Sequence, residues 1–465
     1  MCDNRHYISE VPLSLNSVRK RVEAFLSSNG LRLAALERYV VISRDEDGDE
    51  IIAGGGLDGN VIKCVAVSEA ARSEGLMNIL VSRLIAIAHE EGHDSVKAFT
   101  KPANENIFKS LGFELLASSK NAILMEDGRG GLPEYRKYLE SLARPGRNGA
   151  IVMNANPFTK GHRYLIEQAA SQVDNLYVIV VKEDRSRFPY VERKAMIEAG
   201  CAGLDNVIVC EGSDYAVSAA TFPTYFLKQL DDATPTHIAL DLDLFVKHIA
   251  RPLGVTVRFA GSEPEDNLTH CYNEMMSEIL PAGGYNATSQ ENGIKFVEIP
   301  RLEQNGRPVS ATSLRKALDR GDLKAAMEFV PVSTVPYLIA ELAERSLRLE
   351  LDTTPKPGLV DKQDNGAHKD MDYALMSASI SALRPYLTKI AVGAVAGVNA
   401  AEIMSIGIDA ETSMLRATGG VNTHKGALFC IGLSVAAASF LACGTGTVDA
   451  DAFRELVSRT ASQIP

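Results

Sequence analysis

The segment Asn154–His162 combines small, polar and basic residues in an order suited to phosphate binding. It reads Asn-Ala-Asn-Pro-Phe-Thr-Lys-Gly-His and follows the apolar run Ala150–Asn154. A helix N-terminus leaves backbone N–H groups unpaired and carries partial positive charge, so phosphates bind there. We expect a helix from about Gly161, with His162 donating to an α-phosphate as negative charge develops. Thr159 is expected either to cap this helix or to bind the same phosphate.

The same segment supplies further predicted nucleotide contacts. These are Asn154, Asn156, Pro157, Phe158 and Gly161. The alternative is a surface turn in which Thr159 is an ordinary helix cap.

A second segment, Val309–Arg315, also combines hydroxyl groups and a cation before a predicted helix. We expect Arg315 to hold the β- or γ-phosphate in a bidentate manner. Hydroxyl side chains are expected to cap the helix and to donate to phosphate oxygens, and they come from Ser310, Thr312 and Ser313.

Between these segments, a predicted strand ends in a cationic stretch. Lys182 and Arg193 are candidates for neutralising phosphate, with Lys182 assigned to the catalytic group. A charged run after a strand is also typical of a solvated loop, and this alternative stays open.

The elements that must position these residues alternate between strand and helix. Strands are predicted at Ala150–Asn154, Leu176–Val181, Val207–Cys210, His237–Leu240, Val255–Ala260 and Ile294–Ile299. Helices are predicted at Arg163–Val173 and Glu192–Leu204. This alternation predicts a doubly wound parallel sheet, which binds ligands beyond the carboxyl ends of its strands.

The rest of the chain divides around this domain. An α/β domain is predicted over residues 1–127, with a strand at Val61–Val67 and a helix at Leu76–Glu90. A linker with a helix at Pro133–Leu142 follows over residues 128–148, and the parallel-sheet domain over residues 149–335. Strand signals then stop, so residues 336–465 are predicted to be all-helical, with breaks at Thr353–Gly358 and Gly419–Gly420.

Three polar clusters interrupt the helical part. Asp361, Asp370 and Asp372 are candidate Mg²⁺ ligands. Candidate phosphate contacts and their neighbours are Lys356, His368, Asn422, His424 and Lys425. Solvated loops with capping aspartates are the alternative.

Composition excludes several classes of function. The chain has 465 residues, a net charge of −11 and no basic tract, which argues against nucleic acid as a partner. Its 7 cysteines are scattered without a C-x-x-C pair, and the N-terminus lacks the apolar core of a signal peptide, so we expect the cytosol. The apolar run Ala427–Gly444 is predicted to be a buried helix rather than a membrane span.

The two phosphate segments together resemble the T/H-x-G-H and I-S-x-T/S-x-x-R signatures of the nucleotidyltransferase superfamily. The closer resemblance is to citrate lyase ligase, on Met153–Ile166, Val181–Asp184, Arg187–Tyr190 and Ala220–Pro223. It implies use of ATP, with Mg²⁺, and acetate to form acetyl-AMP. It also implies acetyl transfer to the thiol of the CoA-derived prosthetic group on the acyl carrier subunit of citrate lyase.

Two further resemblances extend over the flanking parts. Val65–Val67 and Arg72–Met77 resemble the acetyl-CoA loop of GNAT acetyltransferases, with Arg72 and Gly75 as loop residues. The C-terminal clusters resemble triphosphoribosyl-dephospho-CoA synthase, which implies ATP and dephospho-CoA as substrates. That resemblance runs from about Leu338 to Pro465, about half of the family's usual length, so we expect an incomplete synthase domain.

Three rival functions stay open at this point. A cofactor-type adenylyltransferase would retain AMP in a dinucleotide product. A GNAT acetyltransferase would need acetyl-CoA and no ATP. A nucleotide- or CoA-binding module would be stabilised by ATP without turnover.

Overall fold

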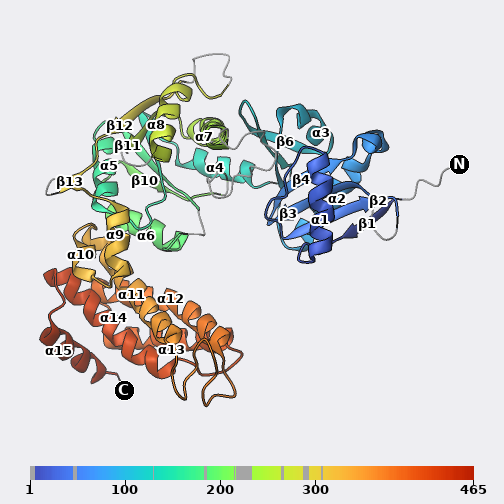
Figure 1. Cartoon of the computed structure of the whole chain (residues 1–465). Coiled ribbons are helices and arrows are strands. Elements are labelled where there is room, and N and C mark those ends of the chain that lie inside the picture. The colour runs from blue at the N-terminus through green and yellow to red at the C-terminus, as the bar shows by residue number, and fades with distance from the viewer. Residues whose placement is uncertain are drawn as a thin grey trace. The chain divides into compact units, whose positions relative to one another are not determined.

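The computed structural model describes residues 6–45, 50–128, 130–182, 186–213, 215, 233–262, 267–285, 293–304 and 307–464. The chain forms two compact units. The first comprises residues 1–153, 169–183 and 206–300, and the second comprises residues 154–168, 184–205 and 301–465. The predicted multidomain α/β class with a helical C-terminal part is confirmed (Figure 1).

The first unit begins with a seven-stranded sheet of order β1-β2-β3-β4-β5-β7-β6. Its strands are β1 (Tyr7–Glu10), β2 (Arg38–Ser43), β3 (Ile51–Asp58), β4 (Val61–Val67), β5 (Lys97–Thr100), β6 (Phe113–Ser118) and β7 (Ile123–Asp127). Its helices are α1 (Asn16–Ser28), α2 (Leu76–Glu90) and α3 (Glu105–Ser110). The strand at Val61–Val67 and the helix at Leu76–Glu90 are therefore confirmed.

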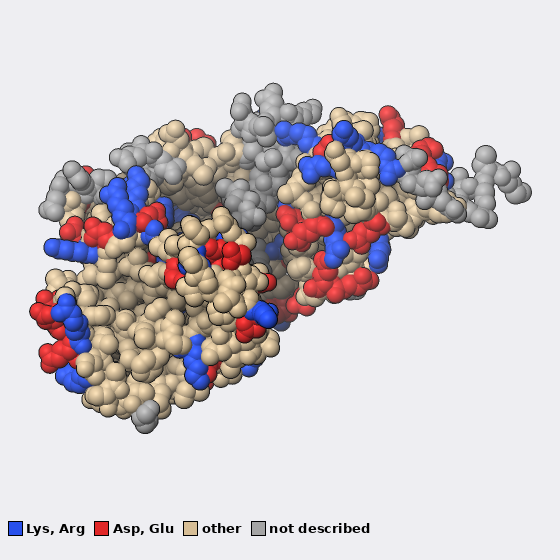
Figure 2. Space-filling view, turned by 60° about the horizontal axis from the view of Figure 1, so that its bottom comes forward, with Lys and Arg blue, Asp and Glu red and all other residues tan. Residues whose placement is uncertain are grey.

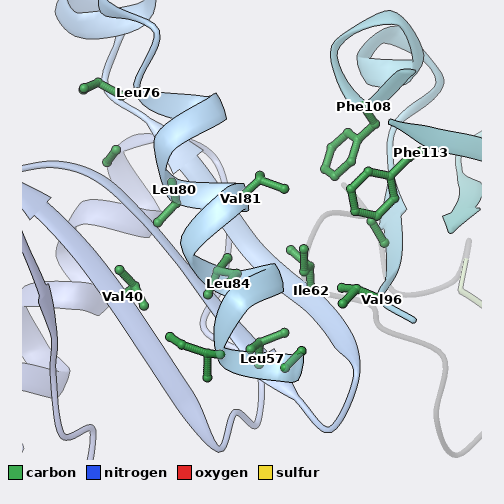
Figure 3. Close-up of a cluster of buried hydrophobic side chains, with 14 of the residues drawn as sticks. Val40, Leu57, Ile62, Leu76, Leu80, Val81, Leu84, Val96, Phe108 and Phe113 are labelled. Atoms are coloured by element: carbon green, nitrogen blue, oxygen red, sulfur yellow. The ribbon is translucent and has the colours of Figure 1, made fainter. Parts of the chain in front are cut away.

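Helix α2 packs on this sheet through an apolar stripe at helical spacing. Leu76, Leu80 and Leu84 are almost completely buried and lie on one face of α2, against strand residues such as Val40 and Leu57 (Figure 3). Burial of each such side chain stabilises the fold by roughly 1.5–3 kcal/mol. This stripe fixes the start of α2, where the predicted CoA loop lies.

The second sheet has five parallel strands of order β10-β9-β8-β11-β12. They are β8 (Asn148–Met153), β9 (Asn175–Val180), β10 (Val207–Cys210), β11 (Val255–Gly261) and β12 (Lys295–Ile299). Along the chain these strands alternate with the helices α5 (Lys160–Ala170), α6 (Tyr190–Gly200), α7 (Ala233–Leu244) and α8 (Asn267–Ile279). Strand β8 is central, and the strand order reverses beside it, where ligands bind in such sheets.

The run His237–Leu240 was predicted to be a strand, and this is wrong, because it lies inside α7. A short apolar run does not distinguish a strand from a buried helix. Ile238 and Leu242 pack in the core of the parallel sheet, whereas Leu240 and Leu244 pack in a core of the seven-stranded sheet. Helix α7 is thus apolar on two faces, which hides the helical period.

Helix α4 (Leu132–Leu142) occupies the predicted linker. Leu132 belongs to a core of the seven-stranded sheet, and Leu139 belongs to the core of the parallel sheet. The linker helix is therefore a packed element, and the domain boundaries at 127 and 148 stay a prediction.

The second unit continues from α9 (Ala311–Asp319) and α10 (Leu323–Met327) into long helices. These are α11 (Val335–Asp352), α12 (Tyr373–Ala396), α13 (Ala400–Ala417), α14 (Lys425–Thr445) and α15 (Ala450–Ala461), and they confirm the helical prediction and both breaks. We call α11–α15 the helical segment.

Helix α14 is the single described helix long and apolar enough to cross a membrane, and 44% of its apolar window is buried in the structure. Core helices of soluble proteins pass the same test. Figure 2 shows a broad face of the helical segment with few charged residues. Exposed apolar side chains on these helices include Ile408, Phe429 and Phe440.

Candidate active site

The loop that follows β8 is held by a buried arginine from α6. Arg193 is 0% exposed, and its guanidinium donates to the carbonyl of Asn154 at 2.8 Å and to its Oδ1 at 2.7 Å. Its Nε also donates to the carbonyl of Phe188 at 3.0 Å. Charge-assisted hydrogen bonds of this kind are strong, so Arg193 fixes the path of the loop.

The prediction that Arg193 neutralises phosphate therefore needs correction. Its side chain is turned into the protein and is used by main-chain and amide oxygens. The cationic run after β9 indicated the right charge, but the spacing along α6 did not reveal that this residue faces inward.

Asn156 links the loop to two other segments of the same unit. Its Oδ1 accepts from the N–H of Phe188 at 3.1 Å, and its carbonyl accepts from Arg315 Nη1 at 3.1 Å. The peptide bond to Pro157 is cis. Ala155 has a φ of +48°, a conformation that costs a non-glycine residue of order 1 kcal/mol or more. The contacts made by Arg193 and Arg315 on either side hold this strained residue in place.

Thr159 and His162 form the first turn of α5. Thr159 Oγ1 accepts from the N–H of His162 at 3.2 Å, and the N–H of Thr159 donates to Nδ1 of His162 at 3.0 Å. Thr159 Oγ1 also lies 2.9 Å from Nδ1. Of the two roles expected for Thr159, these contacts support capping.

The bond from Thr159 determines the tautomer of His162. Because Nδ1 accepts a backbone proton, the neutral imidazole carries its own proton on Nε2. Burial, together with the positive charges of Arg301 and Arg315, lowers the pKa of His162 to about 4. His162 is thus a neutral Nε2–H donor at physiological pH.

Arg301 is a residue that the sequence analysis missed. Its charge acts on His162 together with that of Arg315, so two guanidinium groups lie near the imidazole. Arg301 follows β12 by two positions, and a cation just beyond the carboxyl end of a parallel strand was the available signal.

The first turn of α5 also offers a backbone donor. The N–H of Lys160 is taken by the carbonyl of Phe329 at 2.9 Å, whereas the N–H of Gly161 has no hydrogen-bond partner among the described residues. A Cβ at Gly161 would lie 3.4 Å from the carbonyl oxygen of Val309, so the position is closely bounded. An amide at a helix N-terminus is suited to a phosphate oxygen.

The ring of Phe158 packs against the imidazole of His162. Its ring is fully buried and stacks on His162 with a centroid distance of 5.9 Å and an interplanar angle of 17°. The ring also lies against Gly200 on α6, where an added Cβ would lie only 2.2 Å from Phe158 Cε1. Gly200 is therefore required for the placement of Phe158.

The second predicted phosphate segment begins α9 as expected. Ser310 is the N-cap residue, and its Oγ accepts from the N–H groups of Thr312 at 3.1 Å and Ser313 at 3.5 Å. Arg315 Nη2 donates to Thr312 Oγ1 at 3.2 Å, which orients the guanidinium toward the loop at Asn156. The structure therefore brings Asn156, His162 and Arg315 together.

Lys182 lies two residues beyond β9 and is exposed. It belongs to the other compact unit, so its catalytic role stays a prediction. Glu183, Asp184 and Ala220–Pro223, which carried part of the family resemblance, lie outside the described residues.

The predicted Mg²⁺ ligands of the helical segment do not form a common site. Asp361 accepts from the N–H groups of Lys356, Gln363 and Asp364, and these bonds lower the pKa of its carboxyl group. Asp372 caps α12 by accepting from the N–H of Leu375 at 2.8 Å. Asp361 and Asp372 thus organise backbone N–H groups, and their role as Mg²⁺ ligands stays a prediction.

The other predicted contact residues of the helical segment make separate contacts. His368 lies 3.9 Å from the exposed Asp370, Asn422 accepts from the N–H of Lys425, and Lys425 pairs with Glu411 at 2.7 Å. No group of three potential metal ligands was found in the part of the chain that the structure describes.

His424 lies in a buried polar cluster that the sequence analysis indicated only in part. Its Nδ1 is 2.8 Å from the hydroxyl of Ser379, which is fully buried and accepts from Thr423 Oγ1 at 2.7 Å. Burial lowers the pKa of His424, Glu350 opposes this effect, and Lys356 adds to it. His424 and Lys356 are thus electrostatic neighbours, and Lys356 Nζ pairs with Glu350 Oε1 at 2.8 Å. Ser379 was missed because it lies inside an apolar helix.

A cavity of about 610 Å³ lies in the first unit where β4 and β5 diverge. The two parallel strands pair only at Val61–Lys97 and Ile62–Ala98. The cavity is lined by Arg72 and Gly75, and Gly75 has a φ of +72°, which favours glycine at the start of α2. Met77 also lines it.

Comparisons with known proteins divide the chain near residue 337. Residues 148–338 match the family model of the citrate lyase ligase C-terminal domain. The [citrate [pro-3S]-lyase] ligase of Klebsiella pneumoniae is 41% identical over 328 residues, which cover 70% of this chain and 94% of that protein. The chain belongs to the citrate lyase ligase family. The corresponding ligase of Escherichia coli K12 is 40% identical over 333 residues, covering 71% of this chain and 93% of that protein.

Residues 336–464 match the family model of ATP:dephospho-CoA triphosphoribosyl transferase. A probable 2-(5''-triphosphoribosyl)-3'-dephosphocoenzyme-A synthase of Vibrio cholerae is 42% identical over 130 residues, covering 27% of this chain. The chain spans 42% of the length of that relative. Its C-terminal part is thus synthase-like, and the chain is a ligase with a second family region.

Among solved structures, Escherichia coli ElaA is 19% identical with a TM-score of 0.22, covering 26% of this chain and 99% of its own. A putative N-acetyltransferase from Lactobacillus plantarum is 15% identical with a TM-score of 0.23, covering 27% of this chain and 98% of its own.

Proposed function

We propose that the chain activates acetate with ATP and acetylates the prosthetic-group thiol of the citrate lyase acyl carrier subunit. An acetate oxygen attacks the α-phosphorus of ATP, the bond to the pyrophosphate leaving group breaks, and acetyl-AMP forms. The thiolate then attacks the acetyl carbon and AMP leaves. The thiol proton is lost to solvent.

The observation that carries this proposal is the neutral His162 held by Thr159 beside two guanidinium groups. A fixed Nε2–H donor stabilises charge on a non-bridging α-phosphate oxygen without releasing its proton. Arg315, Arg301 and the Gly161 N–H are suited to the departing pyrophosphate. Catalysis then depends on positioning and charge stabilisation rather than on a covalent protein nucleophile.

Mg²⁺ would enter with ATP, because this ion is usually held by substrate phosphates together with one or two carboxylates. Bound to the phosphates, it would neutralise their charge. The residues of the loop and of α9 act on the phosphates themselves in this proposal. We also propose a cytosolic location, where the carrier and ATP are available.

The cavity of the first unit is proposed to hold the CoA-derived arm of the carrier. Its volume of about 610 Å³ and the loop at Gly75 suit a pantetheine chain and its pyrophosphate. The acetyltransferase alternative uses the same cavity for acetyl-CoA, so only the reaction distinguishes them.

A second candidate function concerns the helical segment. The buried His424, hydrogen-bonded to Ser379 and within electrostatic reach of Lys356, supports binding of ATP or dephospho-CoA phosphates there. Formation of triphosphoribosyl-dephospho-CoA would require the 2′-hydroxyl of dephospho-CoA to displace adenine from C1′ of ATP. Release of adenine from ATP by the full chain is the direct test.

The ligase proposal is tested by pyrophosphate release from ATP with and without acetate, followed by mass analysis of the deacetylated carrier. Acetate-dependent release and acetylated carrier are expected. Product dinucleotide containing AMP would instead identify an adenylyltransferase, and transfer from acetyl-CoA without ATP would identify an acetyltransferase. Thermal stabilisation by ATP with no pyrophosphate would identify a binding module.

A further inference from the structure

A buried ion pair joins α6 to α12 of the helical segment. Glu192 on α6 and Arg384 on α12 are 7% and 6% exposed. Arg384 donates to Glu192 through Nε at 3.1 Å and through Nη2 at 2.7 Å, so the pair is bidentate. Thr388 on α12 donates to Glu192 Oε1 at 2.6 Å. Both carboxylate oxygens are thus bound by α12.

Arg384 is satisfied by further contacts in the same unit. Its Nη1 donates to Glu344 on α11 at 2.9 Å, and its guanidinium lies 5.7 Å from the ring centroid of Phe188. Phe188 is fully buried, and its N–H holds the side chain of Asn156. The pair therefore contacts the loop-supporting residues directly.

A second arginine, which lies just before α6, also contacts the helical segment. Arg187 Nη1 donates to Asp319 on α9 at 2.7 Å, and its Nε donates to the buried Glu341 on α11 at 2.8 Å. Arg187 and Glu192 thus fix residues 187–193 to the helical segment. Phe188 and Arg193 fix the same residues to the loop that follows β8, which we call the ATP loop.

The two partners lie in different family regions of one chain. Glu192 lies within residues 148–338, matched by the ligase model, and Arg384 lies within residues 336–464, matched by the synthase model. The two ligase relatives align with this chain over 328 and 333 residues. These alignments cover 94% and 93% of the relatives but 70% and 71% of this chain.

From these contacts we propose that the helical segment is a working part of the ligase: Arg384 and Thr388 act as positioning residues for the ATP loop through Glu192. This inference rests on the proposed ligase function. Removing one member of a buried ion pair leaves an uncompensated charge, so the neighbouring structure must move. Because Arg193 adjoins Glu192 on α6 and holds Asn154, that movement reaches the ATP loop.

The test uses the full chain with matched threonine variants. Thr388→Val removes the hydrogen bond to Glu192, and Thr418→Val removes buried bonds from Thr418 to carbonyls within the helical segment. We expect Thr388→Val to raise the KM for ATP by roughly threefold or more, with kcat less affected, since loss of uniform binding appears in KM. Thr418→Val is expected to lower the urea midpoint without changing this KM.

Charge variants give a larger signal. Arg384→Met and Glu192→Gln are each expected to weaken ATP binding by about tenfold or more, while the double variant is no weaker than either one, because the two residues act as a unit. Calorimetric titration with ATP alone measures this effect without turnover. An inactive wild type would remove the ligase function but leave this measurement intact.

Unchanged ATP affinity and KM in folded Thr388→Val and Arg384→Met would overturn the positioning role. An equal effect of Thr418→Val would overturn it too, because general destabilisation would then explain the loss. If Arg384→Met does not fold, Thr388→Val with its control decides.

Discussion

The backbone N–H of Thr159 donates to Nδ1 of His162 at 3.0 Å. This bond makes His162 a donor through Nε2 rather than a proton acceptor at that atom. It also opposes protonation of the ring, because an imidazolium cannot accept at Nδ1. The lowered pKa of His162 and its geometry therefore agree.

We predict that His162 stays neutral well below pH 6.5. Its folded-state pKa of about 4 lies below the unfolded value near 6.5, so the unfolded state binds more protons between these values. Protein stability due to this group falls as the pH drops from 6.5 toward 4. Histidine-labelled NMR titration, assigned with His162→Gln, measures the pKa and the Nε2–H tautomer. A midpoint near 6.5 would contradict the prediction.

Loss of the Nε2–H donor is expected to reduce adenylation strongly. His162→Ala should lower kcat for acetate-dependent pyrophosphate release by roughly 10²–10⁴-fold, as for other charge-stabilising donors. His162→Gln, which keeps an N–H donor, should retain more activity than His162→Ala. Equal activity of His162→Ala and wild type would rule out this role.

Arg301 should influence both ATP and His162. Its positive charge helps to keep the pKa of His162 low, so Arg301→Met is expected to raise that pKa. The same substitution should raise the KM for ATP about tenfold, as loss of a charge-assisted phosphate contact would. Both changes are measured on one variant, by NMR titration and by steady-state kinetics. An unchanged pKa of His162 in this variant would mean that Arg301 does not lie near the imidazole in solution.

Gly200→Ala should disturb the support of His162. The new Cβ would lie 2.2 Å from Phe158, and overpacking of this kind typically costs about 1–3 kcal/mol. Urea unfolding should show this loss together with weaker ATP binding. Gly407→Ala on α13 is the control, because its Cβ meets no atom within 4 Å and alanine favours a helix by up to about 1 kcal/mol. Similar midpoints for the two variants would refute the proposed packing constraint.

Asp372 should act as a helix cap and not as a metal ligand. Asp372→Ala is expected to cost roughly 0.5–2 kcal/mol of stability, whereas Asp372→Asn keeps the capping oxygen and should cost much less. Added Mg²⁺ should shift the unfolding midpoints of wild type and Asp372→Ala equally. A Mg²⁺-dependent shift that is lost only in Asp372→Ala would restore the metal site.

The strands of the parallel sheet could be predicted because short apolar runs alternate with helix-period segments along the chain, and in β8 and β9 nearly every residue is buried. The site segments could be predicted because Thr159, Ser310 and Arg315 stand at helix starts, where local capping chemistry governs residue type. The sequence shows that residue 193 is cationic but not which way its side chain points. The inward orientation of Arg193 depends on its contacts with Asn154, 39 positions earlier.

Other features depend on tertiary neighbours that a pattern does not contain. Helix α7 was mistaken for a strand because Ile238 and Leu240 are buried in different cores. Asp361 and Asp372 carry the charge of metal ligands but serve nearby backbone N–H groups. Glu192 and Arg384 are 192 positions apart, and neither has a local signal for the other.

The two apolar faces of α7 limit how this enzyme can be dissected. A shortened protein starting after residue 127 would leave Leu240 and Leu244 facing water, since their packing partners lie in the seven-stranded sheet. Inactivity of such a fragment would report aggregation or unfolding rather than loss of carrier recognition. Substitutions in the cavity lining, such as Arg72→Ala, isolate that question while both cores stay closed.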